Sequence, residues 1–168
     1  MRFPLMIGVA ALALAACNSE QKSPGGDRAA AASGERLTQA SAEKIVGDAE
    51  ASWGSGRIET VMANYADNAV VFDTTALPPT TDRNVVARGN SAFLTMKPAD
   101  FRADPRHVQL LDNDTIVSSG VLSFTANVGL GRPVLKTRYT QIYQRQPDGS
   151  FKIVHEHMSS PPPGTGTP

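Results

Sequence analysis

Four strand-type runs in the second half of the chain restrict the possible folds more than any other feature of the sequence. They cover residues 106–111, 115–128, 134–145 and 150–159. The segments between them contain Asp, Asn, Gly or Pro, which favour tight hairpin turns; they are residues 112–114, 129–131 and 147–149. Because strands joined by short turns pair with their neighbours, the sequence predicts an antiparallel meander.

The preceding part of the chain has the periodicity of helices. Apolar side chains recur at helical spacing in two sets: Ala42, Ile45, Val46, Ala49 and Trp53, then Ile58, Val61, Met62 and Tyr65. Thr38 is the expected N-cap of the first helix, and Gly54 and Gly56 are its expected stop. A strand at 69–72 and a short helical stretch at 92–96 follow. Helices first and strands afterwards predict an α+β domain, with the helices on one face of the sheet.

The N-terminal segment has the pattern of a lipoprotein signal peptide. Arg2 supplies a positive charge, residues 3–13 are almost wholly apolar, and small residues precede Cys17. Residues 14–17 therefore resemble a lipobox, in which the cysteine thiol is acylated before cleavage. Cys17 is also the only cysteine, which excludes an intramolecular disulfide. The alternative is an ordinary secretory leader with a cysteine there by chance.

Lipidation predicts both a location and a domain plan. A chain acylated at Cys17 is anchored to a membrane through that lipid. Asn18 stands where an aspartate usually retains Gram-negative lipoproteins in the inner membrane, so we expect the outer membrane of the cell envelope, facing the periplasm. The expected plan is a signal peptide at 1–16, a flexible tether at 17–36, a folded domain at 37–160 and a disordered Pro-rich tail at 161–168.

Composition and motifs argue against several classes of partner and reaction. Hydrophobic residues make up 40% of the 168 residues, and the formal net charge is +0 with no basic run, which argues against a nucleic-acid partner. The sequence contains no Gly-rich phosphate loop, no G-x-S-x-G elbow and no Cys/His nucleophile pair. Hydride transfer, phosphoryl transfer and acyl-enzyme chemistry are therefore disfavoured, and no cofactor is expected.

Local motifs and the order of elements together resemble the nuclear transport factor 2-like superfamily. The motifs are Trp53-Gly54-Ser55-Gly56, residues 61–66, Arg88-Gly89, Arg138-Tyr139-Thr140 and residues 148–159 with their closing His-x-His-x-Ser. Within the superfamily, the ending is similar to SnoaL-like domains and to the association domain of calcium/calmodulin-dependent kinase II. Two positions depart from the family pattern: Arg57, where an Asp is common, and Phe151, where a Trp is common.

The resemblance implies a fold and an assembly, and leaves the reaction open. It implies a strongly curved, mostly antiparallel sheet wrapped by the N-terminal helices into a cone with a pocket at its open end. It also implies a homodimer or larger homo-oligomer formed through the outer sheet face. The superfamily includes ketosteroid isomerases, dehydratases, polyketide cyclases, binding proteins and oligomerisation modules, so function has to be argued from the site.

Strand alternation sorts the candidate site residues into two faces. Successive residues of a strand point to opposite faces, so Ile153, His155 and His157 share one face of the last strand, and Arg138 belongs to the matching face of the preceding strand. We expect Arg138, His155 and His157 to line the interior of the cone. The opposite face, which a partner subunit would cover, then carries Tyr139, Tyr143, Val154 and Met158.

The two closing histidines allow three interpretations. His155 and His157 can be hydrogen-bonded structural residues, or they can bind a ligand and exchange protons near neutral pH, with His157 as a catalytic base. They can also bind a metal with His107 as a third ligand, but no carboxylate or cysteine cluster supports that interpretation, and no metal is predicted.

The remaining candidates also have a structural alternative. Arg138 can bind an acidic group or an oxyanion of a ligand, or it can form an ion pair with an acid such as Asp73. Asp73 can be a general base, or it can cap the turn that follows it. Trp53 and Tyr65 can wall a ligand pocket, or they can belong to the core at helical spacing.

Three functions follow from these residues. The first is a membrane-anchored domain that binds a small molecule, apolar or aromatic with an acidic group, through Trp53, Tyr65, Arg138, His155 and His157. The second is a cofactor-free isomerase, dehydratase or lyase in the same pocket. The third is an assembly module that dimerises through the sheet.

Overall fold

The computed structural model describes residues 36–74 and 78–162. The predicted signal peptide, Cys17 and nearly all of the tether and tail lie outside these residues. The described elements, in chain order, are α1 (Gln39–Ala51), the 3-10 helix η1 (Ser52–Ser55), α2 (Ile58–Met62), β1 (Tyr65–Phe72), α3 (Arg83–Thr95), β2 (Ala99–Leu110), β3 (Thr115–Thr125), β4 (Val134–Arg145) and β5 (Phe151–Ser159).

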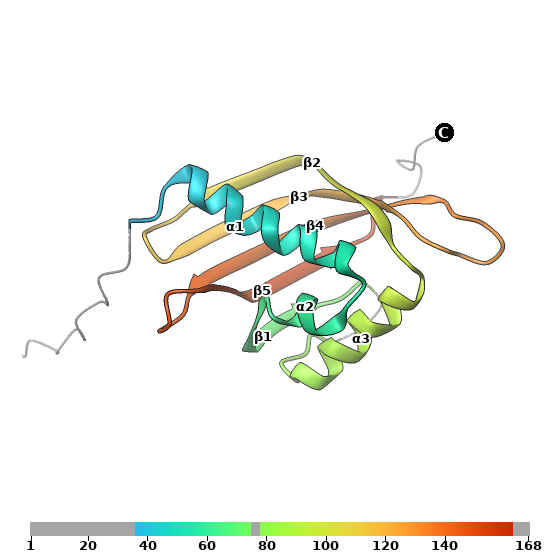
Figure 1. Cartoon of the computed structure of the whole chain (residues 1–168), viewed down its shortest axis with the longest axis horizontal. Helices are drawn as coiled ribbons and strands as arrows, with labels where there is room; N and C mark the ends of the chain where they lie inside the picture. Colours follow the sequence, from blue (N-terminus) through green and yellow to red (C-terminus); the bar gives the residue numbers. More distant parts are fainter. Residues whose placement is uncertain (1–35, 75–77, 163–168) are drawn as a thin grey trace, which may run out of the picture. The chain divides into compact units, whose positions relative to one another are not determined.

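The fold is α+β, with helices that precede most of a five-stranded mixed sheet. The strand order is β1-β5-β4-β3-β2. Strands β2 to β5 pair antiparallel with their neighbours in sequence, which confirms the predicted meander. Strand β1 joins the edge of the sheet parallel to β5. Figure 1 shows α1 crossing one face of this sheet, with α2 and α3 near β1.

The predicted strong curvature of the sheet is wrong. The central pair, β3 and β4, keeps one continuous register from Thr115–Gln144 to Thr125–Val134, and the sheet is not strongly curled (Figure 1). Register shifts, which are where a sheet bends, occur in the other three ladders of the described strands, β1–β5, β2–β3 and β4–β5. Bending is therefore local, and the long central strands stay extended.

Helix α1 forms as predicted because both its cap and its apolar face are present. The Thr38 hydroxyl accepts a hydrogen bond from the Ser41 backbone N–H, and the Ser41 side chain accepts one from the Thr38 backbone N–H. Ala42, Val46 and Ala49 recur on the buried face. Gly56 ends the following 3-10 helix with a left-handed φ of 65°.

Two element boundaries differ from the sequence-based expectation. Tyr65 begins β1 rather than ending the second helix, since α2 stops at Met62 and Arg83 donates hydrogen bonds to the carbonyls of Met62, Tyr65 and Ala66. Helix α3 begins nine residues before the predicted stretch at 92–96, at Arg83. Apolar periodicity in its first half is weak, and Val86 is the only buried residue of the helix.

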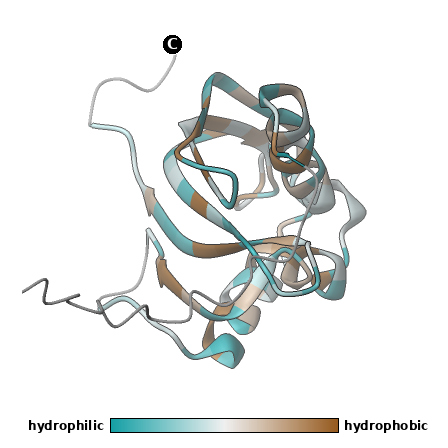
Figure 2. Ribbon diagram, turned by 90° about the vertical axis from the view of Figure 1, so that its left-hand side faces the viewer, coloured by the Kyte–Doolittle hydropathy of each residue, from teal (hydrophilic) through white to brown (hydrophobic). Residues whose placement is uncertain are grey.

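The core lies between the helices and the face of the sheet that they cover. Its most buried side chains are Ala42, Val46, Val61, Ile116, Tyr143 and Ile153. Figure 2 shows apolar and polar positions alternating along the strands, as expected when one face is covered and the other is not. No helix within residues 36–74 and 78–162 is both long and apolar enough to cross a membrane.

Gly120 on β3 is required by a bulge in its neighbour, and this gives a first prediction. The β2–β3 register shifts between Ala103 and Arg106, and a Cβ on Gly120 would lie 2.1 Å from the Pro105 carbonyl oxygen. Since that atom belongs to the backbone, the strand must move. We expect Gly120→Ala to lower the free energy of unfolding by about 1–3 kcal/mol, measured by urea denaturation.

The matched control is Gly54→Ala, because a Cβ on Gly54 would meet nothing within 4 Å. Equal stability losses in the two variants would show that the close approach at Gly120 is not tight.

Candidate functional site

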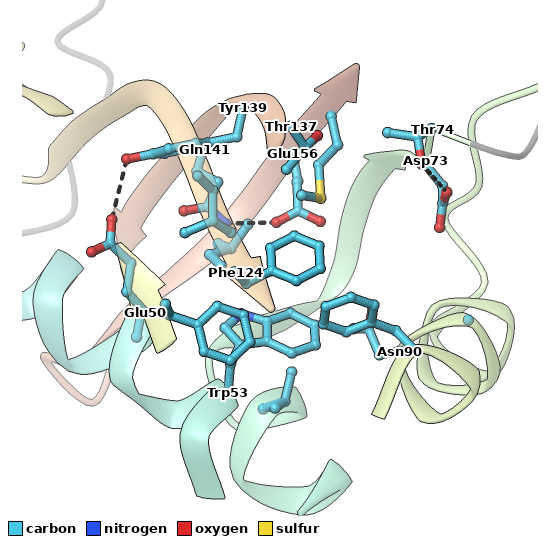
Figure 3. Close-up of a pocket in the computed structure, with 18 of the residues that line it drawn as sticks. Glu50, Trp53, Asp73, Thr74, Asn90, Phe124, Thr137, Tyr139, Gln141 and Glu156 are labelled. Atoms are coloured by element: carbon cyan, nitrogen blue, oxygen red, sulfur yellow. Dashed lines mark hydrogen bonds between the residues drawn. The ribbon is translucent and has the colours of Figure 1, made fainter. Parts of the chain in front are cut away.

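A cavity of about 540 Å³ opens between the helices and the covered face of the sheet. Residues from α1, η1, α2 and α3 form one side, and residues from all five strands form the other. Figure 3 shows its labelled residues, with carboxyl and phenol groups above and aromatic rings below. The volume is within the range of small-molecule sites, so the cavity is the candidate binding site.

Four aromatic side chains form one wall of the cavity: Trp53, Phe93, Phe101 and Phe124. Phe93 is at their centre, with its ring edge-on to Trp53 at 5.4 Å and to Phe124 at 5.1 Å between centroids. Phe101 stacks on Phe124 at 5.6 Å. Edge-to-face contacts hold rings in defined orientations, so this wall is a preformed apolar surface.

Glu156 of β5 is the most buried acid of the cavity lining, at 3% exposed. The Tyr65 hydroxyl donates to its carboxylate, with its oxygen 3.0 Å from Oε1 and 2.9 Å from Oε2. Gln141 Nε2 donates to Oε2 at 2.6 Å, and the Tyr143 hydroxyl donates to Gln141 Oε1 at 2.7 Å. A chain of polar side chains therefore orients one carboxyl group at the cavity.

Burial shifts the proton equilibria of this chain. Desolvation raises the pKa of Glu156 above 4.5; the hydrogen bonds from Gln141 and Tyr65 oppose this shift, and the charge of Asp73 adds to it. Desolvation, followed by the charge of Glu156, raises the pKa values of the Tyr65 and Tyr143 phenols well above 10. Both phenols consequently stay protonated and act as hydrogen-bond donors near neutral pH.

A second cluster of polar side chains is centred on Glu50 of α1. The Tyr139 hydroxyl donates to Glu50 Oε1 at 3.1 Å, and Arg106 Nη1 donates to Glu50 Oε2 at 2.9 Å. Burial raises the pKa of Tyr139 to about 12. Glu50 and Tyr139 line the cavity, whereas Arg106 is outside its lining, so this pair ties α1 to the sheet beside the cavity.

Three of the predicted site residues line the cavity. Trp53 and Tyr65 wall it, and Asp73 lies just beyond the end of β1, with Thr74 donating to its Oδ1 at 3.3 Å. Tyr65 is both a core residue and part of the cavity wall. It is 4% exposed and belongs to the core cluster, and its hydroxyl donates to Glu156.

The prediction that Arg138, His155 and His157 line the interior is wrong. None of the three belongs to the cavity lining, and Arg138 and His157 are exposed on the opposite face of the sheet. The expected partner-facing residues Tyr139, Tyr143 and Met158 line the cavity instead. The structure therefore exchanges the two predicted faces for these residues.

A β-bulge in β5 explains this exchange. Tyr143 pairs with Ile153 and Ile142 pairs with His155, so Val154 is an extra residue in the ladder. Ile153 faces the core as predicted, but after Val154 the alternation moves by one position. Glu156 and Met158 consequently face the cavity with their partners Gln141 and Tyr139, while His157 pairs with Thr140 on the outer face.

On the outer face, the two histidines contact an aromatic ring. Phe72 of β1 lies 5.7 Å from His155 and 5.4 Å from His157 between ring centroids. In the part of the chain that the structure describes, no group of three or more His, Cys, Asp or Glu side chains is arranged to hold a metal ion. The outer pair thus has the surroundings of packed surface histidines.

Sequence patterns alone did not reveal Glu156, Gln141, Glu50 or the three phenylalanines of the wall as cavity residues. Regular alternation assigns Glu156 and Gln141 to the outer face, and only the bulge at Val154 brings Glu156 inward. A usable signal was present: Tyr139 and Tyr143 are large aromatic residues on the same face of β4, and both are buried.

The chain belongs to the SnoaL-like domain family. A family model for the SnoaL-like domain matches residues 43–163, which is most of the chain and nearly all of the described domain. A comparison with curated proteins finds no match.

Solved structures share this fold. A candidate calcium/calmodulin-dependent protein kinase II association domain from Xanthomonas campestris is 26% identical, with a TM-score of 0.67 over 77% of this chain and 96% of the other. A candidate ketosteroid isomerase from Parabacteroides distasonis is 20% identical, with a TM-score of 0.60 over 73% and 89%. A candidate dehydratase of the NTF2-like family from Streptomyces avermitilis is 17% identical, with a TM-score of 0.59 over 71% and 92%.

The raised pKa of Glu156 predicts a specific pH dependence of stability. The folded protein keeps this proton at pH values where the unfolded chain has lost it, so the contribution is complete below 4.5 and is lost as the pH rises through the folded pKa. Glu156→Gln removes this loss. As the pH rises from about 4 to about 8, we therefore expect the free energy of unfolding of the natural protein to fall relative to that of the variant.

The control is Glu43→Gln, an exposed position on α1, which should keep the natural pH profile. Parallel profiles for the natural protein and Glu156→Gln would contradict a raised pKa.

Proposed function

We propose that the protein is a small-molecule-binding domain that takes an apolar or aromatic molecule into the cavity. The observation that carries the proposal is the cavity of about 540 Å³ with an aromatic wall on one side and the Glu156–Tyr65–Gln141 chain on the other. Such a lining, mostly apolar with a few oriented polar groups, is typical of binding sites. The aromatic wall would hold the ligand body, and the polar chain would orient it.

The expectation of an acidic group on the ligand loses its basis. It depended on Arg138 and the closing histidines pointing inward, but these side chains belong to the outer face. The cavity instead presents Glu156, Glu50 and Asp73. Carboxylates repel an anion, so the proposal is restricted to neutral or cationic molecules.

Catalysis in the same cavity is a second candidate. A desolvated carboxyl group can act as a general base, and Glu156 has a raised pKa and a phenol in contact with it, with Asp73 also in the lining. Relatives of this fold include the candidate ketosteroid isomerase and dehydratase named above. A cofactor-free isomerase, dehydratase or lyase would use Glu156 or Asp73 as base, and the release of a chemically changed ligand would identify it.

The assembly function is less well supported. A pure assembly module would be expected to have a filled interior and an apolar outer sheet face. The cavity is open, and exposed polar residues such as Arg138, Thr140 and His157 occupy the outer face. The homodimer or larger homo-oligomer implied by the family resemblance remains a prediction.

We further propose that Cys17 is lipidated and anchors the domain to the outer membrane, on its periplasmic side. The support is the position of the only cysteine directly after an apolar segment and small residues. Acyl chains embedded in the bilayer contribute about 0.8 kcal/mol per buried CH₂, enough for a stable anchor when two or more are present.

Probe binding tests the binding proposal. The neutral fluorophore N-phenyl-1-naphthylamine is titrated into the full chain carrying Cys17→Ser, and its emission should rise as it enters the cavity. Ala92→Trp places a bulky side chain at an exposed cavity position of α3. We expect this variant to bind the probe about tenfold more weakly, because probe and indole compete for the same volume.

The matched control is Val85→Trp, an exposed position on the same helix outside the cavity lining. Binding that Ala92→Trp and Val85→Trp leave equally strong would place the probe elsewhere and count against the proposal.

Cell fractionation tests the anchor. Expressed in a Gram-negative bacterium, the natural chain should sediment with the outer membrane and incorporate an alkyne-labelled fatty acid, because its cysteine carries the acyl chains. Cys17→Ser should remove the label and move the protein to the soluble fraction, whereas Ser23→Ala should change neither. A labelled or membrane-bound Cys17→Ser protein would refute lipidation at this residue.

A further inference from the structure

The charged groups of the cavity lining are mostly acidic. Glu50, Asp73 and Glu156 come from α1, the end of β1 and β5, and among the described lining residues the one cation is Lys136, which is exposed. Glu50 is paired with Arg106 and Tyr139. Figure 3 shows Glu156 between Glu50 on one side and Asp73 on the other. The interior therefore favours positive charge.

Glu156 has acceptor capacity that the protein does not use. A carboxylate offers about four lone-pair positions. Its donors in the described structure are the single hydroxyl hydrogen of Tyr65, shared between both oxygens, and one N–H of Gln141. The carboxylate faces the cavity with positions open, and burying it without further partners is unfavourable. A ligand that donates hydrogen bonds would fill those positions.

Aromatic rings line the same cavity as this carboxylate. In the view of Figure 3, Phe124 is drawn below Glu156 and Trp53 lower still, and Phe93 and Phe101 complete the wall through their contacts with Phe124. A cation over the face of an aromatic ring is attracted by the ring quadrupole, and an apolar body packs on the same surface. The carboxylate and the rings together therefore fit an ammonium group attached to an apolar or aromatic body.

We infer that the cavity is selective for organic amines, with a protonated amino group at Glu156 and an aromatic or apolar body on the Trp53–Phe124 wall. This inference rests on the proposed binding function and names its ligand class. A metal ion fits the site less well, because the described carboxylates do not gather into a metal-binding cluster. An acidic ligand would face three carboxylates with only exposed Lys136 to attract it.

Three probes with the same ring test the inference: 2-phenylethylamine, 2-phenylethanol and phenylacetate. Each is titrated near pH 7 into the full chain carrying Cys17→Ser. The readout is the fluorescence of Trp53, the only tryptophan, which lines the cavity. We expect the amine to bind about tenfold more tightly than the alcohol, because a charge-assisted hydrogen bond replaces a neutral one. Phenylacetate should bind most weakly.

Variants assign the preference to the carboxylates. Glu156→Gln should bring the ratio of amine to alcohol affinity close to one and leave alcohol binding nearly unchanged. Asp73→Asn, at a less buried cavity position, should lower the ratio and provides the test if Glu156→Gln does not fold. Glu43→Gln, exposed on α1 and outside the lining, should keep the ratio of the natural chain.

Each outcome decides between the two proposals. If N-phenyl-1-naphthylamine binds but the amine binds no better than the alcohol, or not at all, the amine inference is overturned and the binding function stands. A ratio that both Glu156→Gln and Asp73→Asn leave unchanged also overturns it. If neither the fluorophore nor any phenylethyl probe binds, the proposed function itself fails.

Discussion

The bulge at Val154 is the constraint on which the rest of the site depends. One extra residue in β5 moves the alternation of every side chain after it, because successive residues of a strand point to opposite faces. Glu156 and Met158 therefore enter the covered face, and His157 leaves it. Without the bulge, the cavity would contain two histidines in place of a carboxyl group, so it would carry basic groups where it now carries an acidic one.

The buried carboxyl group has a free-energy cost, and the structure shows how the cost is reduced. Tyr65 comes from the start of β1 and Gln141 from β4, so elements far apart in sequence supply the donors of Glu156. Those donors only partly offset desolvation, which leaves the pKa of Glu156 raised. Natural proteins keep such unfavourable groups mostly where function uses them, and here the group faces an open cavity beside an aromatic wall.

Membership of the SnoaL-like family accounts for the fold and says little about chemistry. The related structures carry names as different as kinase association domain, isomerase and dehydratase. A shared sheet and helix arrangement supports all of these, because the side chains that line the cavity can change while the backbone stays. In this chain the lining combines carboxylates, phenols and four aromatic rings, with no arginine or histidine among its described residues, and this combination distinguishes ligand classes better than the fold does.

The sequence by itself determined the α+β class, the antiparallel meander of β2 to β5 and helix α1 with its Thr38 cap, because turn residues, apolar periodicity and capping are local signals. It also identified Trp53, Tyr65 and Asp73 at the cavity. Only the tertiary structure decided which face of β4 and β5 points inward, since the ladder between strands, and not the order of residues, shows that Val154 is unpaired. It also decided that β1 joins β5 and that Phe93, Phe101 and Phe124 meet Trp53, because pairing and packing between distant segments leave no periodic trace in either segment alone.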